Sequence, residues 1–144
     1  MDVGRALELA GGQKLGVLVT LRKDGRPQLS NVMYATSAGL VRISVTNGRA
    51  KTANLRRDPR ASLYVGREDG WAYLVLDGEA ELSDVAADPD DAVVDELVEL
   101  YRALEGEHPD WAEYRRAMVE DRRLVVRLHP ARAYGMWEQA ETTG

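Results

Sequence analysis

The chain has 144 residues, of which 44% are hydrophobic and 30% are charged, and its formal net charge is -5. These values are typical of one globular domain, and the net negative charge argues against non-specific nucleic-acid binding by the chain as a whole. The sequence has no cysteine, which excludes disulfides, thiolate catalysis and cysteine-based zinc sites. No apolar run is long enough to span a membrane, and the first residues lack the apolar core of a signal peptide. We therefore expect a single domain over 1–144, located in the cytoplasm.

The first half of the chain predicts a short helix followed by three strands. The opening segment MDVGRALELAGG favours the helix. The hairpin turn between the first two strands is expected at Asp24-Gly25, because glycine adopts a positive φ there at little cost. The three strands are predicted over 14–21, 27–36 and 40–46.

Two local features refine this first half. The second strand alternates irregularly between apolar and polar residues, which indicates a β-bulge near Ser30 and Asn31. A short helix is expected over 49–57, because this segment contains good helix formers and no internal glycine or proline. Its predicted N-cap is Thr46 or Asn47, and Asp58-Pro59 ends it.

The second half adds four strands and two helices. A bulge is expected at Gly78, since glycine inside a strand often marks one. Carboxylates and a proline at 88–91 favour the start of a helix. The predicted strands are 60–67, 71–84, 123–129 and 132–137, the helices are 88–104 and 111–121, and the tail after Trp137 is expected to fray. Short hairpin connections predict a mainly β protein with a mainly antiparallel sheet, and six or seven such strands favour a barrel over a sandwich.

The segment GRAKTANLRRDPR, residues 48–60, gathers five cations and one carboxylate in an otherwise acidic chain. Arg49 and Lys51 fall in the first turn of the predicted helix, where the helix dipole disfavours positive charge. An anion bound there would explain this, because backbone N–H groups, a guanidinium and an ammonium would converge on one phosphate. The alternative is that all five cations are solvated surface residues. Nucleic-acid binding is disfavoured, because no aromatic residues are interleaved with the cations.

Two other segments contain candidate ligand contacts. Gln28, Ser30 and Asn31 follow a tight turn, and they could hydrogen-bond a heterocycle or a ribityl chain, or form the wet face of an edge strand. Trp71 and Tyr73 are two residues apart on a predicted strand, so they would share one face and could stack on a planar ligand or pack in a dimer interface.

No side chain shows the spacing of a metal site or of a nucleophilic triad. His108 and His129 are both expected to be ordinary surface residues, and no G-x-G-x-x-G or P-loop motif is present. Any demanding chemistry would therefore have to come from a cofactor.

Three segments, LGVLVTLRKDGRPQLSNV, GRAKTANLRRDPRASLYV and DGWAYLVLDGEAEL, together resemble the pyridoxamine 5'-phosphate oxidase-like split β-barrel superfamily. The specific part is the pattern R-x-K-T-x-N-L-R-x-D-P-R after a strand that begins D-G-x-P. The later segment ALEGEHPDWAEYRRAMVEDRRLVVRLHPARAYGM is similar to the actinobacterial branch that uses the deazaflavin coenzyme F420.

The resemblance implies a six-stranded antiparallel split β-barrel that forms a homodimer, with two cofactors bound at the dimer interface. It also implies a set of cofactor contacts, which fall into three groups. These are Arg49 and Lys51 on the phosphate with Thr52 and Asn54 beside them, Gln28, Ser30 and Asn31 along the ring and ribityl chain, and Trp71 and Tyr73 from the partner chain. Arg56, Arg57 and Arg60 would serve a polyglutamate tail or simply the surface.

The activity that the resemblance implies is hydride transfer between coenzyme F420 and a small planar acceptor, such as a quinone, a biliverdin-like tetrapyrrole or a nitro-aromatic compound. Tyr34 or Tyr73 is a candidate to stabilise or protonate this acceptor. The alternatives are an FMN-dependent enzyme of the pyridoxamine phosphate oxidase type and a non-catalytic carrier of F420 or FMN. Against the FMN-dependent enzyme, the sequence shows no obvious second basic cluster that would bind a substrate phosphate. Neither nucleic acid nor membrane insertion is expected.

Overall fold

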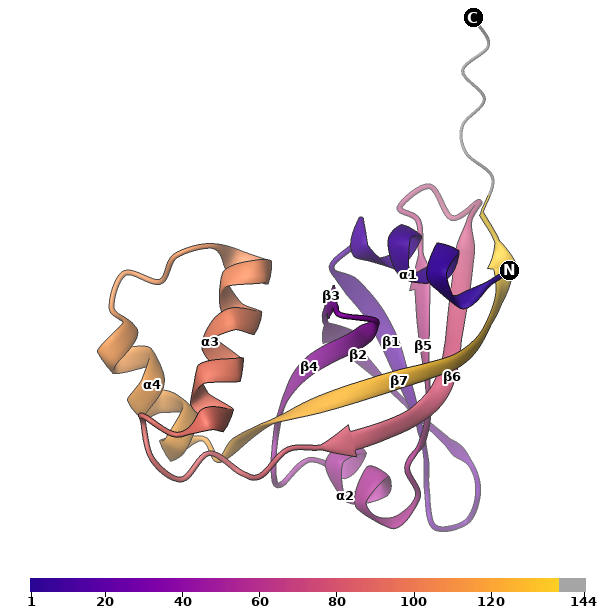
Figure 1. Ribbon diagram of the computed structural model, residues 1–144. Helices are drawn as coiled ribbons and strands as arrows, with labels where there is room; N and C mark the ends of the chain where they lie inside the picture. The colour runs from indigo at the N-terminus through magenta and orange to yellow at the C-terminus, as the bar shows by residue number, and fades with distance from the viewer. Residues whose placement is uncertain (138–144) are drawn as a thin grey trace, which may run out of the picture.

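The computed structural model describes residues 1–137, and a curved antiparallel sheet forms its main body (Figure 1). The chain runs through the elements α1 (Val3–Gly11), β1 (Leu15–Leu21), β2 (Pro27–Met33), β3 (Ala35–Ser37), β4 (Leu40–Thr46), α2 (Ala50–Arg57), β5 (Arg60–Gly66), β6 (Tyr73–Leu82), α3 (Ala92–Glu105), α4 (Trp111–Glu120) and β7 (Arg123–Met136).

The strands are hydrogen-bonded in the order β2-β1-β5-β6-β7-β4-β3, and each pair of neighbours is antiparallel. The sheet curls into a half-barrel, with α1 across one end and α2 near the other (Figure 1). The predicted mainly β split barrel is confirmed, although the described part of the chain has a 7-stranded sheet where six strands were expected.

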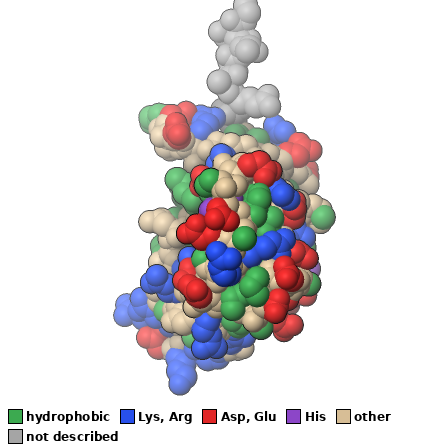
Figure 2. All heavy atoms as spheres, turned by 90° about the vertical axis from the view of Figure 1, so that its left-hand side faces the viewer, with side chains coloured by type: hydrophobic (Ala, Val, Ile, Leu, Met, Phe, Trp, Pro, Cys, Tyr) green, Lys and Arg blue, Asp and Glu red, His purple; other side chains and the backbone are tan. Residues whose placement is uncertain are grey.

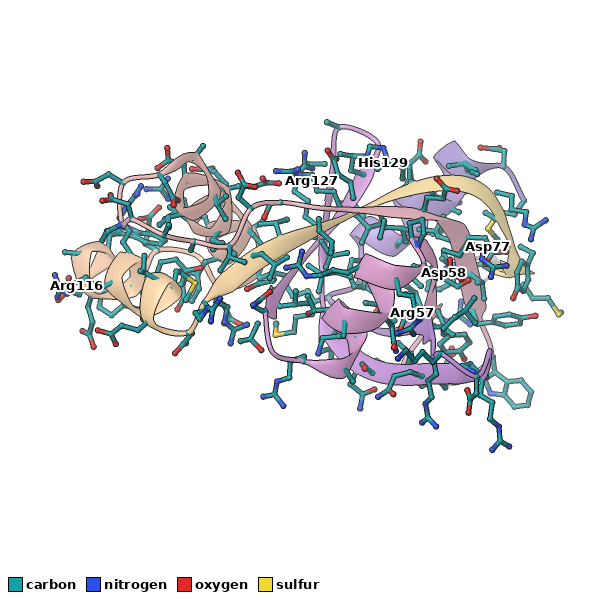
Figure 3. All side chains as sticks on the ribbon, turned by 90° about the horizontal axis from the view of Figure 1, so that it is seen from below. Arg57, Asp58, Asp77, Arg116, Arg127 and His129 are labelled. Atoms are coloured by element: carbon teal, nitrogen blue, oxygen red, sulfur yellow. The ribbon has the colours of Figure 1, made fainter. Side chains whose placement is uncertain are left out.

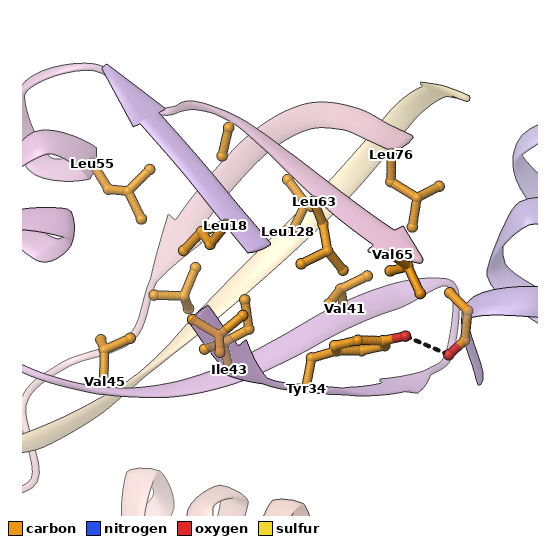
Figure 4. Close-up of a cluster of buried hydrophobic side chains, with 14 of the residues drawn as sticks. Leu18, Tyr34, Val41, Ile43, Val45, Leu55, Leu63, Val65, Leu76 and Leu128 are labelled. Atoms are coloured by element: carbon orange, nitrogen blue, oxygen red, sulfur yellow. Dashed lines mark hydrogen bonds between the residues drawn. The ribbon is translucent and has the colours of Figure 1, made fainter. Parts of the chain in front are cut away.

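Tyr34 divides the predicted strand 27–36 into β2 and β3. Its side chain is completely buried, and its hydroxyl donates a hydrogen bond of 2.6 Å to the Ala10 carbonyl of α1 (Figure 4, dashed line). The prediction that Tyr34 protonates an acceptor is therefore wrong, because this hydroxyl lies in the core. The bulge predicted near Ser30 and Asn31 is also wrong, since β1 and β2 pair without a break.

The last two predicted strands form one strand, β7, that continues through Pro130. The register between β6 and β7 shifts at Gly78, which confirms the predicted bulge. Pro130 pairs with Gly78 at this irregular point, where a residue without an N–H group is tolerated. A Cβ atom on Gly78 would lie 2.0 Å from the His129 carbonyl oxygen, so only glycine fits this close approach of the two strands.

The core lies inside the curved sheet and includes residues of every strand except the short β3 (Figure 4). Strand alternation places one apolar face of each strand inward. Burying each large aliphatic side chain of this kind contributes roughly 1.5–3 kcal/mol. Fully buried members include Leu18, Ile43, Leu63, Leu74 and Leu128.

Helices α3 and α4 form a hairpin that projects from one side of the barrel, between β6 and β7 (Figure 1). The hairpin has a small core of its own, in which Leu97, Tyr114 and Met118 pack with Val125 of β7. Helix α3 starts after Asp91, whose side chain caps it by accepting a 2.9 Å hydrogen bond from the Val94 N–H. None of the helices within residues 1–137 is long and apolar enough to cross a membrane.

Glu96 fastens the helix α3 to the sheet. Its carboxylate accepts hydrogen bonds from Arg42 of β4 at 3.0 Å and from Arg127 of β7 at 2.9 Å. The hydrogen bonds and charge of Arg127, followed by those of Arg42, hold the pKa of Glu96 below its ordinary value of 4.5 against the opposing effect of burial. The ion pairs of Glu96 with Arg42 and Arg127 therefore stabilise the protein as long as the Glu96 carboxylate is ionised.

We expect Glu96→Gln to lower the free energy of unfolding by about 1–3 kcal/mol at neutral pH, because two arginines lose a charged acceptor. The folded-state pKa is the lower one, so this stabilisation is present above pH 4.5 and is lost as the pH falls through the folded value. Urea unfolding of both proteins at several pH values should show their difference shrinking below pH 4.5. Glu99→Gln, one turn away and bonded to Arg102, is the control. A difference that does not change with pH would contradict this role.

Candidate functional site

The helix α2 begins without a side-chain cap. Arg49 occupies its N-cap position with extended backbone (φ -82, ψ 152). Thr46 and Asn47 were the predicted N-caps, but neither side chain caps the helix, so this prediction is wrong. The Thr46 carbonyl accepts a 2.8 Å hydrogen bond from the Thr52 hydroxyl, and the Asn47 side chain accepts one of 2.6 Å from Arg56. Within residues 1–137, neither Arg49 nor Lys51 has a side-chain hydrogen bond or an ion pair, so both cations are available to a ligand.

Arg123, the first residue of β7, joins this cationic group. It pairs with Thr46 at the end of β4, directly before the turn into α2. One terminal nitrogen, Nη1, donates to the Ser44 hydroxyl at 3.3 Å. Within residues 1–137, the Nε atom of Arg123 is buried and has no hydrogen-bond partner. An unpaired buried donor costs about 1–3 kcal/mol, so an acceptor bound beside it would stabilise the protein.

The three cations interact electrostatically. The pKa of Lys51 lies below its ordinary value, first because burial disfavours its charged form and then because Arg49 and Arg123 repel it. An anion among these side chains would be attracted by all three and would favour the charged form of Lys51. The arrangement is therefore suited to a phosphate or carboxylate group.

A cavity of about 380 Å³ opens beside Lys51 and Arg123. These two cations and Ser44 line it together with mostly apolar side chains from β2 and from the α3–α4 hairpin. The remaining lining residues are Asn31, Val32, Met33, Leu100, Tyr101, Leu104, Glu105, Tyr114 and Met118. The cavity thus suits a ligand with an anionic group and an apolar or aromatic body.

A second cavity, of about 650 Å³, lies on the other side of Arg123. Arg49 and Arg123 line it together with the turn before α2 and the turn after α4. Two carboxylates, Glu120 and Asp121, also line it. Arg123 is therefore a shared wall of the two cavities.

Thr52 and Asn54 face the protein interior. Thr52 is fully buried and donates to Thr46, while Asn54 donates a 3.1 Å hydrogen bond to the Thr20 hydroxyl and accepts one of 2.9 Å from Arg57. Helical periodicity turns these positions of α2 toward the barrel. Their side chains hold α2 on the barrel, and neither lines the cavity beside Lys51.

The three predicted polar residues of β2 do not share a face. The strand alternates strictly, so Asn31 points to the outer face and lines the cavity beside Lys51, whereas Gln28 and Ser30 point to the opposite, barrel side. Gln28 accepts a 3.2 Å hydrogen bond from Arg22. The structure therefore brings only Asn31 of this group next to the cations.

Trp71 and Tyr73 also differ in setting. Trp71 lies in the turn before β6 and is 84% exposed, so the expectation that both residues share one strand is wrong. Tyr73 is the first residue of β6, and its ring stacks on Tyr64 of β5 at 5.8 Å. Neither residue lines the cavity of its own chain beside Lys51.

The other cations of the segment 48–60 already have partners within the chain. Arg56 donates to Asn47, Arg57 donates to the Leu21 carbonyl at 2.8 Å, and Arg60 pairs with Asp58 at 2.8 Å. Arg57 and Asp58 lie beside each other on the lower side of the barrel (Figure 3). Positive side chains collect toward this end of the molecule, whereas both signs are mixed on the face of the hairpin (Figure 2). These arginines stabilise the surface around α2.

The outer face of the sheet carries an exposed apolar surface, which we call the outer patch. The strand register aligns its members across β2, β1, β5, β6 and β7. They are Leu15, Leu29, Met33, Tyr64, Tyr134 and Met136, each more than a third exposed. Met33 belongs both to this patch and to the wall of the cavity beside Lys51, so the cavity opens at the edge of the patch.

The fold and the cation-lined cavity define a split-barrel protein with a site for an anionic ligand. The chain matches the pyridoxamine 5'-phosphate oxidase family over residues 5–137. It belongs to that family, which confirms the superfamily that the sequence resembles.

Three solved structures show the same fold. The conserved hypothetical protein Rv2991 from Mycobacterium tuberculosis is 20% identical with a TM-score of 0.73, and the match covers 100% of this chain and 95% of that one. An F420 reductase is 25% identical with a TM-score of 0.61, over 84% of this chain and 89% of the other. An FAD-binding protein from Mesorhizobium loti is 17% identical with a TM-score of 0.66, over 94% and 92%.

Proposed function

We propose that the protein is an oxidoreductase that uses coenzyme F420 and transfers a hydride to a small planar acceptor, such as a quinone, a biliverdin-like tetrapyrrole or a nitro-aromatic compound. The observation that supports it most is the cavity that Lys51 and Arg123 line together with mostly apolar and aromatic side chains. The similarity to an F420 reductase at 25% identity favours the deazaflavin over a flavin.

The residues present fit a phosphate-bearing cofactor. Arg49 and Lys51 would hold its anionic group at the first turn of α2, and Asn31 would contact its polar chain or ring edge from β2. Thr52 and Asn54 would act through α2, by fixing the helix that carries Lys51. When bound, the deazaflavin supplies hydride chemistry, so the protein has to position the acceptor and exclude water.

We also propose that the protein is a homodimer whose two copies meet at the outer patch. A soluble monomer rarely exposes a contiguous apolar surface of this kind. Tyr64 of this patch stacks on Tyr73, and the exposed Trp71 lies two residues before Tyr73 in the chain. A second copy would cover the open edge of the cavity at Met33, and this supports the partner-chain role proposed for Trp71 and Tyr73.

A substitution at Leu29 tests the proposed dimer. This residue is 62% exposed at one end of the β2 edge of the patch, and Leu29→Asp would place a charge in an apolar interface. We expect the wild-type chain to sediment as a dimer and Leu29→Asp as a monomer. Ala112→Asp, on the exposed side of α4, adds the same charge elsewhere and should remain dimeric. A wild-type monomer would contradict the proposal.

Titration of the protein with oxidised F420 and, separately, with FMN tests the proposed cofactor, with tryptophan fluorescence as the signal. Tighter binding of F420 supports the proposal, and tighter binding of FMN favours an FMN-dependent enzyme of the oxidase type. Oxidation of reduced F420 in the presence of an acceptor panel then separates an enzyme from a carrier. Binding without turnover on the whole panel would indicate a carrier.

A further inference from the structure

We propose that Arg123 is a third ligand of the anionic group, and that its Nε–H donates directly to a phosphate oxygen held by Arg49 and Lys51. This inference rests on the proposed function for the identity of the complete ligand. It assigns a binding role to a residue of β7, more than seventy positions away from the cationic segment of α2.

The first argument is the geometry of the strands. β4 and β7 pair from Val41↔Leu128 to Thr46↔Arg123, so Arg123 stands at the point where β4 ends and the turn to α2 begins. The Asn47 N–H donates to the Arg122 carbonyl at 3.0 Å and ties the turn to the start of β7. The side chain of Arg123 then lines both cavities, the one with Lys51 and the one with Arg49. Arg123 therefore joins the cavity of Lys51 to that of Arg49, and both arginines lie close enough to Lys51 to lower the pKa of its ammonium.

The second argument is the unpaired donor. A guanidinium has five N–H groups, and buried ones are normally all paired. Ser44 holds Nη1 of Arg123 and thereby orients the group, yet within the described chain the buried Nε has no acceptor. Glu105 lines one cavity and Glu120 and Asp121 line the other, but none of these carboxylates pairs with Arg123.

The third argument is the charge balance. Lys51 is repelled by Arg123 as well as by Arg49, so the ligand-free protein holds these cations together at a cost in stability. Arg127, in contrast, has its charge balanced by the carboxylate of Glu96. A phosphate ester supplies the missing negative charge, and its oxygens can accept from a guanidinium and an ammonium at the same time.

The test uses Arg123→Met, which keeps an unbranched apolar stem but removes the guanidinium and its charge, and Arg123→Lys, which keeps the charge but removes Nε. Arg116→Met is the matched control, because Arg116 points away from the barrel on the outer side of α4 (Figure 3). Thermal unfolding of each protein is followed with added inorganic pyrophosphate at constant ionic strength. Affinities for F420 and FMN are then measured by tryptophan fluorescence.

We expect pyrophosphate to raise the Tm of the wild type and of Arg116→Met but not that of Arg123→Met, whose ligand-free Tm should equal or exceed that of the wild type. Cofactor affinity should fall on the order of 10- to 100-fold in Arg123→Met, and Arg123→Lys should lose part of it. A lower ligand-free Tm with unchanged cofactor affinity would assign Arg123 a structural role and overturn the inference.

The inference and the proposed function can fail separately. Arg123-dependent stabilisation by pyrophosphate, without binding of F420 or FMN, would support the anion site and remove the proposed cofactor. Binding of F420 or FMN with equal affinity by the wild type, Arg123→Met and Arg123→Lys would support the function and overturn the role of Arg123. Binding of neither pyrophosphate nor cofactor would overturn both.

Discussion

Lys51→Ala is expected to weaken binding of the phosphate-bearing cofactor by roughly 30- to 100-fold, which corresponds to the loss of a charged hydrogen bond. Lys51 lines the cavity with Arg123 and has no side-chain partner within residues 1–137. Its ammonium is therefore not needed to hold the fold. Removing it should leave the Tm of the ligand-free protein unchanged or slightly raised, because repulsion from Arg49 and Arg123 is relieved.

The measurement is a fluorescence titration of wild type, Lys51→Ala and Lys23→Ala with the cofactor that binds. Lys23 is an exposed lysine in the β1–β2 turn and controls for the loss of one positive charge. The affinity should also fall with added salt in the wild type and less steeply in Lys51→Ala. Equal affinities in all three proteins would mean that the anionic group binds elsewhere.

Gly78→Ala is expected to destabilise the fold by about 3 kcal/mol or more, because it forces overpacking between two central strands. The new Cβ would lie 2.0 Å from the His129 carbonyl oxygen and 3.0 Å from the Pro130 Cα. Both contacts are with backbone atoms, so no side chain can move aside to relieve them. The strands β6 and β7 would have to separate at the register shift.

Thermal unfolding measures this effect, and a decrease in Tm of about 10 °C is expected. Gly48→Ala is the control, since a Cβ there meets nothing within 4 Å and its φ is not positive. That variant should unfold within about 2 °C of the wild type. A similar small shift in Gly78→Ala would show that the bulge is easily rearranged.

The sequence predicted the elements whose signals are local. The Asp24-Gly25 turn, the alternation in 40–46 and the glycine at 78 each depend on neighbours in the chain, and the structure confirms the corresponding hairpin, strand and bulge. Pro130 was interpreted as a strand end because proline cannot donate to a ladder. That interpretation failed because the register shifts at this point: β7 has one extra residue, Ala131, beside Pro130, and the strand continues through both.

The site was less predictable, since it depends on pairings that are remote in sequence. Arg123 reaches Lys51 only because β7 pairs with β4, and its signal in the sequence is no more than a charged residue at the start of an apolar strand. The side chains of β2 alternate strictly between the two faces of the sheet, so Asn31 points to the opposite face from Gln28 and Ser30. The inward positions of α2 could have been assigned from its periodicity, which places Thr52 toward the core.

The attachment of the α3–α4 hairpin has a consequence for how members of this family can diversify. The two ends of the hairpin are joined side by side, since the Ser83 N–H donates to the Val125 carbonyl at 2.9 Å and the Ala86 N–H to that of Arg123 at 2.8 Å. An insertion closed at its base can change length with little effect on the rest of the fold. The hairpin supplies Leu104 and Met118 to the cavity but nothing to the main core. Changes in the hairpin beyond Glu96, which ties it to Arg42 and Arg127, can therefore accommodate a different ligand while the barrel and the cations near α2 stay unchanged.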